Sequence, residues 1–149
     1  MTVLDEPNEL LASTGYLLAR AGSESRRRFV EALARHDLTL ATYSVLMILG
    51  AEEGATQRRL ATAVGIDPRN LVPILDDLEA RGFIVRQADH EDRRRHAVML
   101  SEAGRAQMVK LAKVGERVEK DFLAGLNVRE RRQLHRLLNT LLTGYISQK

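Results

Sequence analysis

The sequence predicts a mainly α-helical chain with one small β-hairpin, and three patterns lead to this fold class. Apolar residues recur at helical spacing in several segments of the 149-residue chain. Single glycines stand where these segments end. Two short runs of β-forming residues flank a charged segment. Two short helices followed at once by a hairpin are the order of elements in a winged helix-turn-helix, and further helices at both termini complete the architecture.

The first helix of the central motif is predicted over residues 57–64. Thr56 is a good N-cap, because its hydroxyl can accept a hydrogen bond from a free amide of the first turn. Gly65 can adopt the left-handed conformation that ends a short helix. A second helix begins after Asp67 with Pro68, since proline at the first helical position loses no hydrogen bond. Its apolar residues recur at helical spacing at Leu71, Ile74, Leu75 and Leu78.

Because of Pro73, two starting points are possible for this second helix. If the helix begins at Pro68, Pro73 falls inside it and removes one backbone donor. A start near Asn70 would instead place Pro73 in the first turn, where the missing donor costs nothing. In both cases the later half of the helix is acidic, so contact with an anion must come from its beginning. The acidic residues are Asp76, Asp77 and Glu79.

The hairpin is predicted directly after the second helix, which we expect to stop at Gly82. Residues 83–85 and 97–100 are short apolar runs that favour β-structure. The charged segment ADHEDRRRH between them therefore forms the tip of the hairpin. Ser101 then caps the next helix.

Apolar stripes mark helices at both ends of the chain. Asn127 and Glu130 form a capping-box-like pair before a C-terminal helix whose apolar residues continue to the terminus. An N-terminal helix starts near Pro7 and carries its own stripe. We expect the two termini to intertwine with those of a second chain, and the alternative is a bundle closed within one chain. The predicted dimerisation residues are Leu10, Leu11, Leu17, Leu138, Leu141, Leu142 and Tyr145.

Basic and short polar side chains lie where such a motif would meet duplex DNA. Arg69 and Asn70 occupy the N-terminal end of the second helix, which in a helix-turn-helix enters the major groove. Arg58 and Arg59 begin the preceding helix, where phosphate contact is expected. Arginines of the hairpin are placed to enter the minor groove. The alternative for each of them is an ordinary surface position without a DNA contact. The predicted contact residues are Thr56, Arg58, Arg59, Pro68, Arg69, Asn70, Arg86, Arg93, Arg94 and Arg95, with His96 as a further candidate.

Net charge gives the DNA hypothesis only weak support. The chain has a formal charge of +3 and a pI near 9.6. Residues 52–100, however, hold eight arginines against nine acidic residues, so the motif itself is not basic. The surplus lies in residues 20–35, which include three consecutive arginines, and in the C-terminal helices. The hypothesis therefore depends on where individual arginines point.

The run LEARGFIVRQADHEDRRRHAVMLSEAGR resembles the wing signature of the multiple-antibiotic-resistance regulators, the MarR family. In that signature an Asp-x-Arg pair at the wing tip precedes a strand ending in Leu-Thr or Leu-Ser. The pair here is Asp92 and Arg94, and the resemblance extends over most of the chain. It implies that Asp92 holds the wing by pairing with an arginine, while Arg94 reaches the minor groove. It also implies one MarR-like domain over 1–149, with a winged helix-turn-helix at 38–100 and helical dimerisation parts at 1–37 and 101–149.

The same resemblance implies a pocket for a small aromatic or anionic effector between the dimerising helices and the reading domain. Arg20 or His36 would face a carboxylate or phenolate, and the other candidates would form apolar walls. Each candidate has an alternative role in ordinary packing, most clearly Met47 within the run VLMIL. Ligand binding would favour a dimer whose reading helices are wrongly spaced, and would so release DNA. The candidates are Tyr16, Arg20, His36, Tyr43, Met47 and Met108.

Several kinds of site are absent from the sequence. There is no cysteine, which excludes disulfides and thiol-based sensing. The four histidines lack metal-ligand spacing, so we expect neither a metal site nor a cofactor. No Gly-rich phosphate loop, nucleophile elbow or paired-carboxylate arrangement is present, which argues against an enzyme. No apolar run has membrane-spanning length and no export signal is visible, so we expect a cytoplasmic protein with no membrane partner.

These features predict a homodimeric transcription factor that binds a palindromic operator in double-stranded DNA. Two reading helices related by a two-fold axis and spaced by roughly 34 Å would meet successive major grooves. A repressor is the simpler hypothesis, because occupying a promoter is enough to block polymerase, whereas activation needs a further surface. The alternative is a winged-helix module that binds only protein, and preference for one operator over bulk DNA would separate the two.

Overall fold

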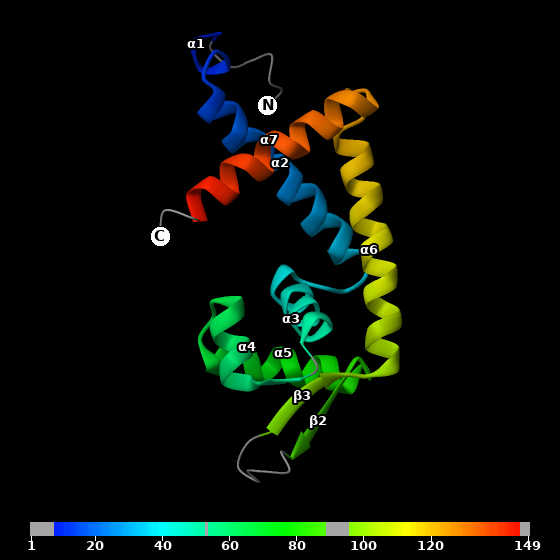
Figure 1. Cartoon of the computed structure of the whole chain (residues 1–149). Helices are drawn as coiled ribbons and strands as arrows, with labels where there is room; N and C mark the ends of the chain where they lie inside the picture. Colours follow the sequence, from blue (N-terminus) through cyan, green and yellow to red (C-terminus); the bar gives the residue numbers. More distant parts are fainter. Residues whose placement is uncertain (1–7, 53, 89–95, 147–149) are drawn as a thin grey trace.

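The computed structural model describes residues 8–52, 54–88 and 96–146. Over these residues the chain is mainly helical with one small sheet, which confirms the predicted fold class (Figure 1). The winged helix-turn-helix lies at one end of the molecule, α2 and α7 lie at the other end, and α6 runs along the side between the two ends. The helices are α1 (Asn8–Leu11), α2 (Thr14–Ala34), α3 (Leu40–Ala51), α4 (Gln57–Val64), α5 (Pro68–Ala80), α6 (Glu102–Phe122) and α7 (Val128–Ile146).

The sheet has three strands, one more than the predicted hairpin. The hairpin strands β2 (Ile84–Ala88) and β3 (His96–Leu100) pair antiparallel, with Ile84 opposite Leu100. A short strand, β1 (Ala55–Thr56), pairs with the other edge of β3, so the order is β1-β3-β2. Two residues are too few to show the alternation by which a strand is recognised in a sequence. β1 joins the start of α4 to the sheet.

α4 begins and ends where its flanking residues predict. It spans Gln57–Val64, the range expected from the sequence. The Thr56 hydroxyl oxygen accepts a hydrogen bond from the Arg59 amide at 3.2 Å. Gly65 ends the helix with a φ of 76°, in the left-handed region where a side chain is disfavoured.

α5 keeps Pro73 in its interior. Asp67 caps the helix, since its Oδ1 accepts a hydrogen bond from the Arg69 amide at 2.7 Å, and the helix runs from Pro68 to Ala80. The alternative start near Asn70 is therefore wrong, because a capped first turn already forms at Asp67.

The hydrophobic core lies inside the winged helix-turn-helix. Buried side chains from α3, α4, α5 and the sheet meet there, and α2 and α6 contribute one each to the cluster. None of the described side chains of α7 is buried. The core thus holds one face of α5 and leaves the opposite face to solvent. Its members are Leu33, Leu38, Val45, Leu46, Leu49, Ala55, Leu60, Ala61, Leu71, Leu75, Leu78, Ile84, Val98, Leu100 and Leu111.

The N-terminal helix differs from its prediction. A single helix starting near Pro7 was expected, but the described chain forms a short α1 and a separate α2, and Pro7 itself lies outside the described residues. Ser13 causes the break, because its side chain caps α2 by accepting a hydrogen bond from the Tyr16 amide at 3.4 Å. The apolar stripe is consequently divided between two helices.

The capping box before α7 is confirmed. Asn127 Oδ1 accepts a hydrogen bond from the Glu130 amide at 3.0 Å, and Glu130 Oε2 accepts one from the Asn127 amide at 2.8 Å. α7 then lies at the end of the molecule remote from the winged motif (Figure 1). No helix among the described residues is both long enough and apolar enough to cross a membrane.

The turn between α5 and β2 is fastened to both long helices. The Arg81 guanidinium donates hydrogen bonds to the carbonyl oxygens of His36 and Asp37, at 3.1 and 2.8 Å, just after α2. Ser101, the cap of α6, donates its amide to the Phe83 carbonyl at 3.0 Å. These contacts fix α5 relative to the two helices that lead to the other end of the molecule.

Candidate nucleic-acid interface

The exposed face of α5 begins with polar and basic side chains. Arg69 and Asn70 are exposed in the first turn, whereas Leu71, Leu75 and Leu78 on the opposite face are buried. Among the described residues, the Arg69 guanidinium has no carboxylate within ion-pair distance. The backbone amides of Arg69, Asn70 and Leu71 are already bonded to Asp67, so the Arg69 guanidinium and the Asn70 side chain are the groups that this end of α5 offers. This end of α5 is suited to an anionic partner.

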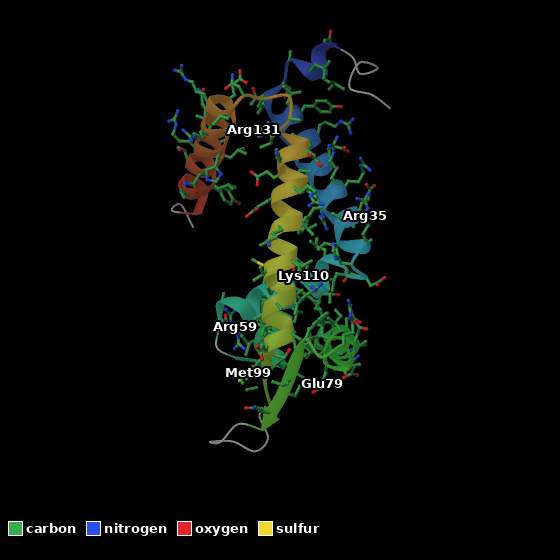
Figure 2. The ribbon with its side chains drawn as sticks, turned by 90° about the vertical axis from the view of Figure 1, so that its right-hand side faces the viewer. Arg35, Arg59, Glu79, Met99, Lys110 and Arg131 are labelled. Atoms are coloured by element: carbon green, nitrogen blue, oxygen red, sulfur yellow. The ribbon has the colours of Figure 1, made fainter. Side chains whose placement is uncertain are left out.

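α4 packs against α5. Of the two arginines at its start, one makes an ion pair within the described residues and the other does not. Arg58 is exposed and makes no ion pair within the part of the chain that the structure describes. Arg59 (Figure 2) pairs with Glu52 after α3, at 2.8 Å between Nη2 and Oε1. Both partners of that pair are in contact with solvent, so its contribution to stability is small. Thr56, also a predicted contact residue, uses its hydroxyl to cap α4.

Arg86 is held against the acidic half of α5 and does not project from the hairpin as we expected. Its Nη2 lies 2.6 Å from Asp76 Oδ1, its Nη1 lies 3.5 Å from Glu79 Oε2, and its side chain is 22% exposed. The two carboxylates explain this placement. Asp77 likewise pairs with Arg81 at 3.3 Å. These pairs neutralise the carboxylates in the later half of α5, for which the sequence alone indicated no partners.

The tip of the wing lies outside the described residues, which resume at His96. The two strands that flank the tip are paired along their whole length. The roles of Asp92, Arg93, Arg94 and Arg95 therefore stay predictions based on the resemblance.

Two of the three consecutive arginines on α2 are paired within their own helix. Arg27 and Arg28 both donate hydrogen bonds to Glu24, at 2.9 and 2.8 Å, and Arg27 also contacts Glu31. The hydrogen bonds from Arg27 and then Arg28 lower the pKa of Glu24 to about 2. The Arg28 guanidinium also lies over the ring of Phe122 in α6, 5.4 Å from its centre. Arg27 and Arg28 therefore supply little uncompensated positive charge.

Only two of the six predicted effector residues line a cavity of about 580 Å³ beside the sheet. Met47 of α3 and Met108 of α6 belong to its wall, Arg105 adds a cation and Glu52 adds a carboxylate. Tyr43 instead packs edge-to-face with the ring of Phe29, 4.9 Å between centres. The six residues do not form one pocket, because the first of them lie in the half of α2 remote from the winged motif (Figure 1). The candidates outside this cavity are Tyr16, Arg20, His36 and Tyr43.

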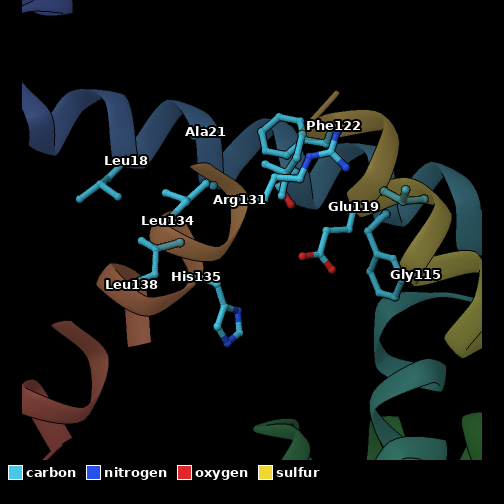
Figure 3. A pocket seen from close by; sticks show the side chains of 14 residues that line it. Leu18, Ala21, Gly115, Glu119, Phe122, Arg131, Leu134, His135 and Leu138 are labelled. Atoms are coloured by element: carbon cyan, nitrogen blue, oxygen red, sulfur yellow. The ribbon is translucent and has the colours of Figure 1, made fainter. Parts of the chain in front are cut away.

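A second cavity, of about 450 Å³, opens between α2, α6 and α7 (Figure 3). Leu18 of α2 and Leu134 and Leu138 of α7 lie together at one side of the opening, and Glu119 and Arg131 belong to the polar part of its lining. None of the predicted effector residues lines it. The apolar stripes of the N-terminal helix and of α7 were its signals in the sequence, but they did not indicate a cavity, because it is assembled from three helices far apart in the chain.

Apolar side chains are exposed on the helices at this end of the molecule. Leu141, Leu142 and Tyr145 of α7 are each 60% exposed or more. Because α7 buries none of its described side chains, the geometry argues against a bundle closed within the chain. The predicted dimerisation residues are exposed at Leu10, Leu17, Leu141, Leu142 and Tyr145 and partly buried at Leu11 and Leu138.

Known proteins share both the sequence and the fold. A model of the MarR family matches residues 38–96. The HTH-type transcriptional regulator SarZ of Staphylococcus haemolyticus is 30% identical over 107 residues, which are 72% of this chain and 73% of SarZ. The transcriptional repressor CouR, solved on a 23-mer DNA duplex, is 38% identical, and the match covers 91% of this chain and 94% of CouR with a TM-score of 0.71. The chain belongs to the MarR family.

Membership of the MarR family confirms the resemblance seen in the wing sequence. As a MarR-family protein the chain is a transcriptional regulator and not an enzyme. The matched region runs from just before α3 to the start of β3, so it coincides with the reading motif. A MarR family protein of Mycobacterium tuberculosis, Rv2887, solved with p-aminosalicylic acid, is 28% identical, with 87% of this chain and 98% of Rv2887 covered and a TM-score of 0.70.

Proposed function

We propose that this protein represses transcription by binding a two-fold symmetric DNA operator as a homodimer. The observation that carries the proposal is the first turn of α5, where Arg69 and Asn70 are exposed on a helix whose other face is buried. A helix held in this way enters the major groove with its first side chains toward phosphates and base edges. CouR, a repressor solved on duplex DNA, supports the proposal as a family member.

The helix contacts divide between base reading and backbone binding. Arg69 and Asn70 contact base edges, because they lie at the end of the helix that enters the groove. Arg58, exposed and without a carboxylate partner among the described residues, contacts a phosphate. Arg59 exchanges its weak surface pair with Glu52 for a second phosphate.

The remaining predicted residues act through the wing or by positioning. Arg93, Arg94 and Arg95 enter the minor groove while Asp92 holds the wing, as the resemblance implies. Arg86 keeps the carboxylates of α5 from repelling the phosphates, since it pairs with two of them.

Two copies of the chain form the functional unit. One chain presents one reading helix, whereas a two-fold dimer presents two at a spacing that matches roughly one turn of the duplex. The apolar side chains left exposed on α1, α2 and α7 supply a surface that can be buried between two chains.

A small anionic effector would reverse the binding. The cavity lined by Met47, Met108 and Arg105 combines apolar walls with a cation that has no carboxylate partner among the described residues. The one carboxylate in its lining, Glu52, is paired with Arg59. Rv2887, solved with an aromatic carboxylic acid, supports an effector of this class. Such a ligand releases DNA if it binds more tightly to a dimer whose two α5 helices are wrongly spaced.

Substitution of two arginines tests this division of contacts. Arg69→Ala should weaken operator binding by about 1–3 kcal/mol, or about 5- to 150-fold, and should reduce the preference for operator over scrambled duplex, because a base contact is lost. Arg58→Ala should weaken binding to both duplexes by about the same factor, because a phosphate contact is independent of sequence. Fluorescence anisotropy on both duplexes gives, for each variant, the ratio of its affinity for the operator to its affinity for the scrambled duplex.

Arg117→Ala is the matched control, since Arg117 is exposed on α6 and its removal changes the net charge equally. It should leave the operator preference unchanged. Equal losses for Arg69→Ala and Arg58→Ala on every sequence would refute the division of contacts. Absence of any operator preference in the unmodified protein would favour a module that binds only protein.

A further inference from the structure

Two apolar residues interrupt the polar exposed face of α5. Val72 is 41% exposed, and Pro73 beside it is exposed as well. The apolar residues that α5 contributes to the core, Leu71, Leu75 and Leu78, lie on its other face. The exposed pair therefore needs an explanation other than packing within the chain.

The pair lies directly behind the turn that carries Arg69. Residues three and four positions apart are neighbours on a helix surface, so Val72 and Pro73 both lie one turn beyond Arg69. Asp76 follows after one further turn, where Arg86 pairs with it at 2.6 Å. The patch is thus bounded by a cation on one side and a neutralised carboxylate on the other. A polyanion can approach it without repulsion.

Pro73 weakens the helix that carries it. Proline has no amide hydrogen, so the carbonyl of Arg69, four residues earlier, lacks the amide partner of a regular α-helix. α5 nevertheless continues unbroken to Ala80, because its buried face holds it against the core. Alanine at this exposed position would form a more stable helix. A destabilising residue on an exposed face that reads DNA points to a contact outside the chain.

We infer that Val72 and Pro73 together read thymine. Their apolar surfaces pack against the C5 methyl group of a thymine in the major groove, which is the apolar feature that distinguishes thymine from the other bases there. The inference rests on the proposed function and deepens it by naming a sequence preference. Each half-site holds a thymine next to the base that Arg69 contacts. The neighbouring cations Arg69 and Arg58 favour DNA over an apolar protein as the partner.

Replacement of thymine by deoxyuridine tests the contact directly, because it removes the methyl group and keeps base pairing. We expect one thymine per half-site whose replacement weakens binding about fourfold, the factor expected for one buried methyl group, and about 16-fold when both half-sites are changed. The double variant Val72→Ser, Pro73→Ala should bind the thymine and deoxyuridine operators equally. Val109→Ser, at an exposed valine of α6, is the matched control and should keep the full methyl dependence.

Thermal unfolding separates this role from a structural one. Pro73→Ala restores a helix amide, so this single variant should unfold at a higher temperature than the unmodified protein. It should nevertheless lose part of the discrimination between thymine and deoxyuridine. Reduced discrimination in a more stable protein cannot come from unfolding.

Two results would overturn the inference while leaving the proposed function intact. One is an operator that is bound specifically and shows no loss at any deoxyuridine position. The other is a methyl dependence that persists in the double variant. Failure to prefer any operator over unrelated duplex would instead contradict the proposed function, and the thymine contact with it.

Discussion

Leu141→Glu should convert the protein from a dimer to a monomer and weaken operator binding at least about a hundredfold. Leu141 is 60% exposed on α7, in the apolar surface that we propose two chains bury together. A carboxylate placed in such an interface loses its hydration without gaining a partner. A monomer then binds one half-site only, and linked binding of two sites typically adds a factor of about 10²–10⁴. Sedimentation velocity and fluorescence anisotropy report the two effects.

Thr143→Glu is the control for the dimer prediction, since Thr143 is exposed on the same helix away from the apolar stripe. The same charge at that position should leave both the oligomeric state and operator affinity nearly unchanged. A folded Leu141→Glu protein that remains a dimer with normal operator affinity would show that α7 does not form the interface.

Gly104→Ala should lower the free energy of unfolding by about 2–3 kcal/mol. Gly104 lies in the first turn of α6, where a Cβ atom would stand 2.0 Å from the carbonyl oxygen of Phe83 and 3.1 Å from Leu100 Cδ2. The obstructing oxygen belongs to the backbone and cannot rotate away. α6 must therefore move from the α5–β2 turn, and the loss of contacts exceeds the roughly 1 kcal/mol that alanine contributes to helix propensity. Urea denaturation at fixed protein concentration measures the difference.

Gly50→Ala is the matched control for this substitution. Gly50 lies in α3 near the same residues, but a Cβ there meets Leu100 Cδ1 at 3.8 Å and Met108 Cε at 4.0 Å, which are ordinary contacts. We expect this variant to be as stable as the unmodified protein or slightly more stable. Equal stabilities of the two alanine variants would mean that α6 is not packed tightly against the turn.

The parts of the fold that are set by local chemistry could be predicted from the sequence. Thr56 and Gly65 bound α4, and Asp67 starts α5, because a cap depends only on residues within one turn of it. The capping box at Asn127 follows the same rule. The family could be recognised because the wing run is itself a contiguous segment.

The parts that depend on distant contacts could not be predicted. β1 is two residues long and is defined only by its pairing with β3. The placement of Arg86 depends on Asp76, which belongs to another element, so the arginine looked available for DNA. The effector candidates were chosen by residue type along three helices, and the structure separates Tyr16 from the cavity at Met47.

The most direct test of operator recognition is binding of the purified protein to the intergenic DNA adjoining its own gene. Fluorescence anisotropy with excess unrelated duplex as competitor, at two salt concentrations, separates specific from general binding. We predict a complex that survives the competitor at both salt concentrations. Weak binding that the competitor abolishes would contradict operator recognition at this site.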